Sequence, residues 1–231
     1  LLWFGWFGFN GGSALAADGA ATLAFVNTLL APAAALTCWM AIDVARTGQT
    51  TAVGAATGIV VGLVAVTPAA GFVGPMAALA LGAIAVVPSY FMILYRSRTR
   101  LDDSLDVASA HGIGGLVGAL LTGVLATAAW GGTDGLLAGN PGLVLRQTIA
   151  VVAVIAYSGL VSLSLLKLIS WFAPIRIEGR AEARGLDVPL HGEEAYGTGE
   201  GAILVIPATG RPTPAASAGN RPVASPAGGD A

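Results

Sequence analysis

The sequence predicts an all-α protein that crosses the membrane several times, and two observations lead to this prediction. Of the 231 residues, 55% are hydrophobic and only 10% are charged, whereas an ordinary soluble domain carries about 25% charged residues. No Asp, Glu, Lys or Arg occurs from Thr47 to Tyr95, or from Val107 to Thr133. Runs of this length suffice for helices of about 20 residues that cross a hydrocarbon core ~30 Å thick.

The apolar residues fall into six segments, and each is predicted to form one transmembrane helix. The segments span about 1–17, 20–44, 51–66, 74–95, 103–130 and 143–172. Their short connections are typical of antiparallel neighbours in a helix bundle. The chain has no starting Met and opens inside an apolar segment. We therefore expect the first helix to be cut short and the chain to be the C-terminal part of a longer protein.

Basic residues follow every second apolar segment, and this alternation predicts the orientation. They are Arg46 after the second segment, Arg96, Arg98 and Arg100 after the fourth, and Arg176, Arg180 and Arg184 after the sixth. The opposite loops contain no Lys or Arg. Because positive charge accumulates in cytoplasmic loops, we expect a multi-pass protein of the inner or plasma membrane with a cytoplasmic C-terminus.

The composition changes after the last apolar segment. Residues 173–200 are rich in polar and charged side chains and are expected to form a cytoplasmic segment. Residues 201–231 are dominated by Pro, Ala and Gly, and such a stretch buries too little apolar surface to offset the entropy of ordering. We expect three regions: a membrane domain over 1–172, a cytoplasmic segment over 173–200 and a disordered tail over 201–231.

Small residues recur every four positions in two of the predicted helices. Gly54, Gly58 and Gly62 share one helix face, and Gly114 and Gly118 share another. Small residues at this spacing let helix backbones approach closely in lipid, where the hydrophobic effect does not drive packing. The pattern predicts that both faces lie against neighbouring helices.

A histidine lies inside the fifth apolar segment. If that helix begins near Asp103, a rise of ~1.5 Å per residue places His111 ~12 Å into the membrane. A polar group there is costly and marks a candidate functional site. An imidazole can relay a proton, and it can equally be a buried group bonded to a helix carbonyl. Since the other histidine, His191, lies in the C-terminal segment, we expect no metal site built on two histidines.

Aromatic residues and a hydroxyl lie near the outer end of the first segment. Trp6, Phe7 and Phe9 are either lipid-facing interfacial residues or the wall of a vestibule, where an aromatic ring face attracts a small cation. Ser13 follows Phe9 by about one helical turn and could supply an oxygen acceptor.

Charged residues at the segment ends have a structural interpretation. Asp102, Asp103 and Asp106 are predicted to begin the fifth helix and to pair with Arg96, Arg98 or Arg100. Asp43 and Arg46 are three residues apart and are predicted to form an ion pair.

Several function classes find no support in the sequence. It contains no nucleotide-binding loop, zinc-binding motif or pair of cysteines, and no broad basic region for nucleic acid. An intramembrane enzyme would need a nucleophile with a base, or a metal set, which His111 alone does not supply. We therefore expect a non-enzymatic protein without cofactor, metal or nucleic-acid partner.

Five motifs in a fixed order resemble the ammonium transporter (Amt/Rh) family, in particular its bacterial Amt branch. They are WFGFNGGS at 6–13, FVNT at 25–28, VTPAAG at 66–71, DDSLDV at 102–107 running into His111 and Gly112, and GLDV at 185–188 with HGE at 191–193. The resemblance covers roughly residues 1–196. It implies an eleven-helix protomer with an inverted repeat, assembled as a homotrimer, of which this chain supplies helices six to eleven and lacks the N-terminal half.

The resemblance also implies roles for single residues. Phe9 matches the outer gate, Ser13 the site that recruits ammonium beside the aromatic wall to which Trp6 belongs, His111 the second pore histidine, and Val107 the apolar pore wall. The implied activity is transport: ammonium is recruited outside and loses its proton, and ammonia passes an apolar pore with a histidine relay. Half of such a repeat cannot enclose a pore, so the fragment alone is expected to be inactive.

The C-terminal segment resembles the regulatory tail of bacterial relatives. Asp187, Glu193 and Tyr196 are the residues assigned to it, and the resemblance implies docking of a PII-type signal protein at the cytoplasmic face. An alternative function is an ammonium sensor that signals through this tail to a PII-type partner.

Overall fold

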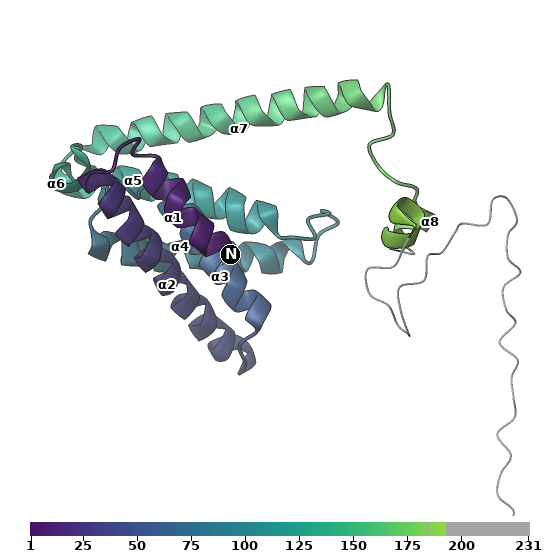
Figure 1. Ribbon diagram of the computed structural model, residues 1–231, viewed down its shortest axis with the longest axis horizontal. Helices are drawn as coiled ribbons and strands as arrows, with labels where there is room; N and C mark the ends of the chain where they lie inside the picture. Colours follow the sequence, from purple (N-terminus) through teal and green to yellow (C-terminus); the bar gives the residue numbers. More distant parts are fainter. Residues whose placement is uncertain (184, 193–231) are drawn as a thin grey trace, which may run out of the picture. The chain divides into compact units, whose positions relative to one another are not determined.

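A computed structural model describes residues 1–183 and 185–192, and this part of the chain is helical (Figure 1). Its longer elements are α1 (Leu2–Gly12), α2 (Gly19–Thr47), α3 (Ala52–Val66), α4 (Pro75–Arg96), the π-helical η1 (Ala108–Ile113), α5 (Gly114–Leu125) and α7 (Pro141–Ser170). The shorter ones are α6 (Ala128–Gly131), η2 (Leu136–Ala138), α8 (Gly179–Ala183) and η3 (Asp187–His191). The chain divides into two compact units, Leu1–Ser162 and Leu163–Ala231.

The first unit contains a bundle built around α2, α3 and α4. Helix α2 packs against α4, α3 and α1, while α5 and η1 pack against α3 and α4 (Figure 1). The core is made largely of small side chains, among them Ala31, Ala35, Ala65, Ala78 and Ala85, which are fully buried. Small side chains at helix contacts are typical of bundles that assemble in lipid.

Four of the described helices are long and apolar enough to cross a membrane. They are Gly19–Thr47, Pro75–Arg96, Ala108–Leu125 and Pro141–Ser170. Every predicted segment contains a helix, but the helices in the first and third segments, α1 and α3, have only 11 and 15 residues. The third segment was therefore predicted at the right place, although its helix is shorter than a typical span.

The fifth predicted segment has the wrong bounds. Helical structure begins at Ala108 instead of Asp103 and ends at Leu125 instead of Trp130. Asp106 has a φ of +53°, a conformation that interrupts a right-handed helix, and Ala126 is extended. The helix start at Asp103 from which the depth of His111 was estimated is therefore wrong, because His111 lies three residues after Ala108.

The predicted glycine packing is confirmed where helices touch most closely. A Cβ atom at Gly58 would lie 2.7 Å from Trp39 Cβ, and one at Gly62 would lie 2.5 Å from Pro32 Cα. A Cβ at Gly118 would collide with the carbonyl oxygen of Ala65. The absence of a side chain at these positions thus sets the spacing of α2, α3 and α5.

The predicted ion pair between Asp43 and Arg46 is wrong for the described part of the chain. Asp43 is 9% exposed and accepts a hydrogen bond of 2.9 Å from the Tyr90 hydroxyl. The Arg46 guanidinium instead lies 5.6 Å from the centroid of the Tyr90 ring and 5.5 Å from that of Phe91. Sequence spacing missed this arrangement because α4 brings a hydroxyl and two ring faces against the end of α2.

We predict that Gly118→Ala destabilises the protein by about 1–3 kcal/mol, since the added methyl overpacks the contact with α3. The matched control is Gly159→Ala, because a Cβ atom there meets nothing within 4 Å and alanine favours a helix. Thermal unfolding of the detergent-purified protein measures both. Equal stability of the two variants would contradict the packing account.

We predict that Tyr90→Phe destabilises the protein by about 1–3 kcal/mol, because the buried Asp43 carboxylate loses its hydroxyl donor. Tyr157→Phe is the control, since the Tyr157 side chain is 70% exposed. A midpoint of thermal unfolding that falls for Tyr90→Phe alone is the expected result. Equal midpoints for the two variants would show that the bond does not matter.

Candidate functional site

Trp6 and Phe9 lie together on α1 and are tied to the end of α3. The Trp6 indole Nε1 donates a hydrogen bond of 2.9 Å to Thr67 Oγ1. The rings of Trp6 and Phe9 lie 5.6 Å apart between centroids. Phe9 is 60% exposed, so its ring is available to close or line a passage.

Ser13 follows directly on the last residue of α1. Its Oγ donates a hydrogen bond of 2.9 Å to the Phe9 carbonyl oxygen. It also lines a pocket of about 300 Å³ together with Asn10, Thr67 and Trp130. Trp6 and Phe9 line a separate pocket of about 390 Å³ with Leu1, Leu2 and Gly5, and the link between the two pockets is the bond from Trp6 to Thr67.

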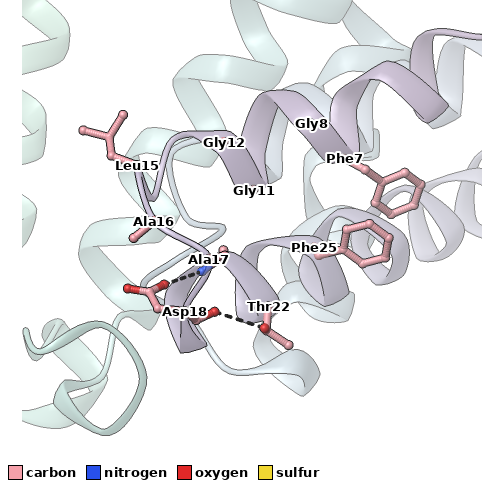
Figure 2. A pocket seen from close by; sticks show the side chains of 11 residues that line it. Phe7, Gly8, Gly11, Gly12, Leu15, Ala16, Ala17, Asp18, Thr22 and Phe25 are labelled. Atoms are coloured by element: carbon pink, nitrogen blue, oxygen red, sulfur yellow. Dashed lines mark hydrogen bonds between the residues drawn. The ribbon is translucent and has the colours of Figure 1, made fainter.

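Phe7 does not lie with Trp6 and Phe9. Its ring stacks on Phe25 of α2 at 4.3 Å between centroids, and both line a second pocket of about 690 Å³ (Figure 2). The Asp18 carboxylate at this pocket accepts hydrogen bonds from Ala20 N and Ala21 N. That carboxylate caps α2 through its Oδ1 atom, so Asp18 has a structural role at the second pocket.

His111 and Val107 lie four residues apart on the exposed side of the η1 region. Val107 is 48% exposed and His111 is also exposed, whereas Ser109 and Ala110 are buried. Neither a hydrogen bond nor an ion pair of the His111 imidazole is found within the described residues. The alternative of a buried histidine bonded to a helix carbonyl is therefore wrong for this part of the chain.

Two charged contacts hold the start of η1. The Asp103 carboxylate accepts hydrogen bonds of 2.9 Å from the backbone N–H groups of Val107 and Ala108. The Arg96 Nη2 atom lies 2.7 Å from Asp106 Oδ1. The predicted pairing is confirmed for Asp106 with Arg96, although the carboxylates precede the helix and do not lie within it.

Sequence reasoning missed Thr67 and Asn10, which line the pocket beside Ser13. Thr67 is 61 residues from Trp6, and Asn10 donates 2.9 Å to Thr28 Oγ1 on the next helix. No local pattern predicts such pairs, because only the packing of α1 against α2 and α3 brings them together.

The remaining predicted residues fall in the second unit or outside the described residues. Asp187 begins η3 and His191 ends it, while Glu193 and Tyr196 lie beyond residue 192, as does the tail over 201–231. Among the described residues, no group of three or more His, Cys, Asp or Glu side chains could hold a metal ion.

The chain was compared with known proteins. Residues 1–196 match the family model described as Ammonium Transporter Family. The chain is 47% identical over 197 residues to an ammonium transporter of Aquifex aeolicus. The aligned region covers 85% of this chain and 46% of the relative. It is 44% identical over 196 residues to the ammonium transporter Amt1 of Archaeoglobus fulgidus, and this alignment covers 85% of this chain and 50% of the relative.

Solved structures agree with these sequence matches. The crystal structure of Candida albicans Mep2 has a TM-score of 0.73 and 34% identity, over 78% of this chain and 41% of that one. A structure described as a sensor Amt protein has a TM-score of 0.74 and 28% identity, and the match covers 82% of this chain and 46% of that one.

These matches show the family of the chain and the share of its relatives' length that it covers. The chain spans about half the length of the curated relatives that it matches. The family match over residues 1–196 includes Trp6, Phe9 and Ser13 at α1 and Val107 and His111 at η1. Its family is one of non-enzymatic transporters with membrane helices. This multi-pass membrane chain belongs to the ammonium transporter family.

Proposed function

We propose that the protein containing this chain carries ammonium or ammonia across the membrane through a pore to which α1 and η1 contribute. The observation that supports the proposal most is the family match over residues 1–196, which includes every residue of both sites. A bare ammonium ion cannot cross hydrocarbon, because an unpaired ion loses its hydration. The protein must therefore recruit the ion, remove its proton and pass neutral ammonia.

Recruitment is assigned to the outer end of α1. The Ser13 hydroxyl donates its proton to the Phe9 carbonyl, so its lone pairs are left to accept an N–H of ammonium. Trp6 is fixed by its bond to Thr67 and presents a ring whose face attracts a small cation. Phe9 stands beside Trp6 as the gate.

Passage is assigned to the exposed side of the η1 region. Val107 offers an apolar wall that suits ammonia better than ammonium. The His111 imidazole has no partner among the described residues, which leaves it able to accept and return a proton. We assign the proton relay to His111.

The assembly is part of the same proposal. Both sites are exposed on a chain that spans about half of its relatives, so the other half would have to close the pore and this chain alone would not transport. We propose helices six to eleven of an eleven-helix inverted repeat, a homotrimer in the inner or plasma membrane, and a cytoplasmic C-terminus. Asp187, Glu193 and Tyr196 would then belong to a regulatory tail for a PII-type protein.

A sensor is the second candidate, and the likeness to the structure described as a sensor Amt protein favours it. The two candidates differ in one measurable respect. A transporter moves ammonium without a partner, whereas a pure sensor binds it and signals without net uptake.

We predict that the complete reading frame encoding this chain restores growth at low ammonium in cells that lack ammonium transporters, and that His111→Ala reduces uptake at least about tenfold. The control is His191→Ala, which removes the other histidine. A complete protein that reaches the membrane without restoring growth would favour the sensor. Uptake unchanged by His111→Ala would exclude the relay.

We predict that Ser13→Ala raises the ammonium concentration for half-maximal uptake about two- to tenfold with little change in maximal rate, as expected for one lost hydrogen bond. Ser170→Ala is the control, because Ser170 also bonds a carbonyl of its own helix. Uptake kinetics at fixed pH measure both. A fall in maximal rate alone would contradict a recruitment role.

A further inference from the structure

The start of η1 is held by residues of two elements. Arg96 is the last residue of α4, and its Nη2 atom lies 2.7 Å from Asp106 Oδ1. The Arg96 and Asp106 side chains are 18% and 28% exposed, so the pair is screened by solvent less than a surface ion pair. The Asp103 carboxylate meanwhile binds the N–H groups of Val107 and Ala108.

Asp106 also has an unusual backbone. Its φ is +53°, a left-handed conformation that is uncommon outside glycine and needs support from its surroundings. In this conformation its N–H bonds the Asp103 carbonyl and its own carbonyl accepts the N–H of Ala110 at 2.8 Å. Asp106 is thus the residue at which the turn stops and helical hydrogen bonding begins.

The register that starts at Asp106 decides which side chains of η1 face outward. Ser109 and Ala110 are buried, while Val107 and His111 are exposed. A shift of one residue turns a helical side chain by roughly 100°, and a shift toward Ala110 would bring His111 to a buried position. π-Helical turns are rare and are frequently found at functional sites, which agrees with a segment whose register has to be held from outside.

We propose that the Arg96–Asp106 ion pair is a positioning device that fixes the register of η1 and so presents His111 to the pore. Arg96 and Asp106 are positioning residues in this proposal, since they act on His111 through the backbone of η1. The part of the proposal that concerns transport rests on the proposed function above. The part that concerns the register of η1 is independent of it.

The transport test uses the complete reading frame. Arg96→Gln lowers the maximal rate of ammonium uptake at least about tenfold, because small displacements of a reacting group are costly. The concentration for half-maximal uptake stays within about twofold, since recruitment at Ser13 is untouched. Arg96→Lys keeps the charge and restores most of the rate. Arg98→Gln, which removes an equal charge from an exposed neighbour, leaves both values unchanged.

A second measurement reports on the helix itself. Hydrogen exchange of the amides of residues 108–113, in the purified protein, is faster in Arg96→Gln and in Asp106→Gly than in the native protein, and exchange in α2 is unchanged. Asp106→Gly tolerates the left-handed backbone but lacks the carboxylate. Native exchange in both variants would overturn the proposal, as would Arg98→Gln reproducing the effect of Arg96→Gln.

The two proposals can fail separately. If His111→Ala leaves uptake unchanged, the relay is wrong, and faster exchange of residues 108–113 in Arg96→Gln still supports the register device. If His111→Ala abolishes uptake while Arg96→Gln has native uptake and native exchange, transport stands and the positioning role is excluded.

Discussion

Close approach of helix backbones is the constraint on which the rest of the structure depends. Gly82 lies so near Ala31, and Gly118 so near Ala65, that a Cβ atom at either glycine would collide with a carbonyl oxygen. Gly58 and Gly62 also bring α3 close to α2, since a Cβ atom there would lie 2.7 Å from Trp39 Cβ or 2.5 Å from Pro32 Cα. Because lipid gives helices little hydrophobic reason to associate, this contact surface defines the bundle. Helix α3 contacts both α1 and η1, the two elements that carry the candidate sites.

Much of this organisation follows from sequence, since its causes are periodic or compositional. Uncharged runs predicted the helices, and glycines at a spacing of four predicted the packed faces. The start of the fifth helix was predicted too early, because Asp103 and Asp106 were assigned to its first turn, whereas Asp106 has a positive φ and precedes the helix.

Polar contacts between distant residues also escaped prediction. Asp43 binds Tyr90, which is 47 residues away, and Trp6 binds Thr67, which is 61 residues away. Each pair depends on which helix faces meet, and spacing along one helix does not supply that information. In both cases the partner is a hydroxyl that satisfies a polar group within the bundle. By contrast, Phe9 and Ser13 are four residues apart in sequence, and a local bond from Ser13 Oγ to the Phe9 carbonyl oxygen joins them.

The central claim, that the complete protein moves ammonium and does so through His111, is tested most directly in liposomes. The purified product of the complete reading frame would be reconstituted alone, and the entry of isotope-labelled ammonium down its gradient would be followed. The account predicts saturable entry that is largely lost in His111→Ala. Absence of entry with correctly inserted protein, or equal entry with both proteins, would contradict it.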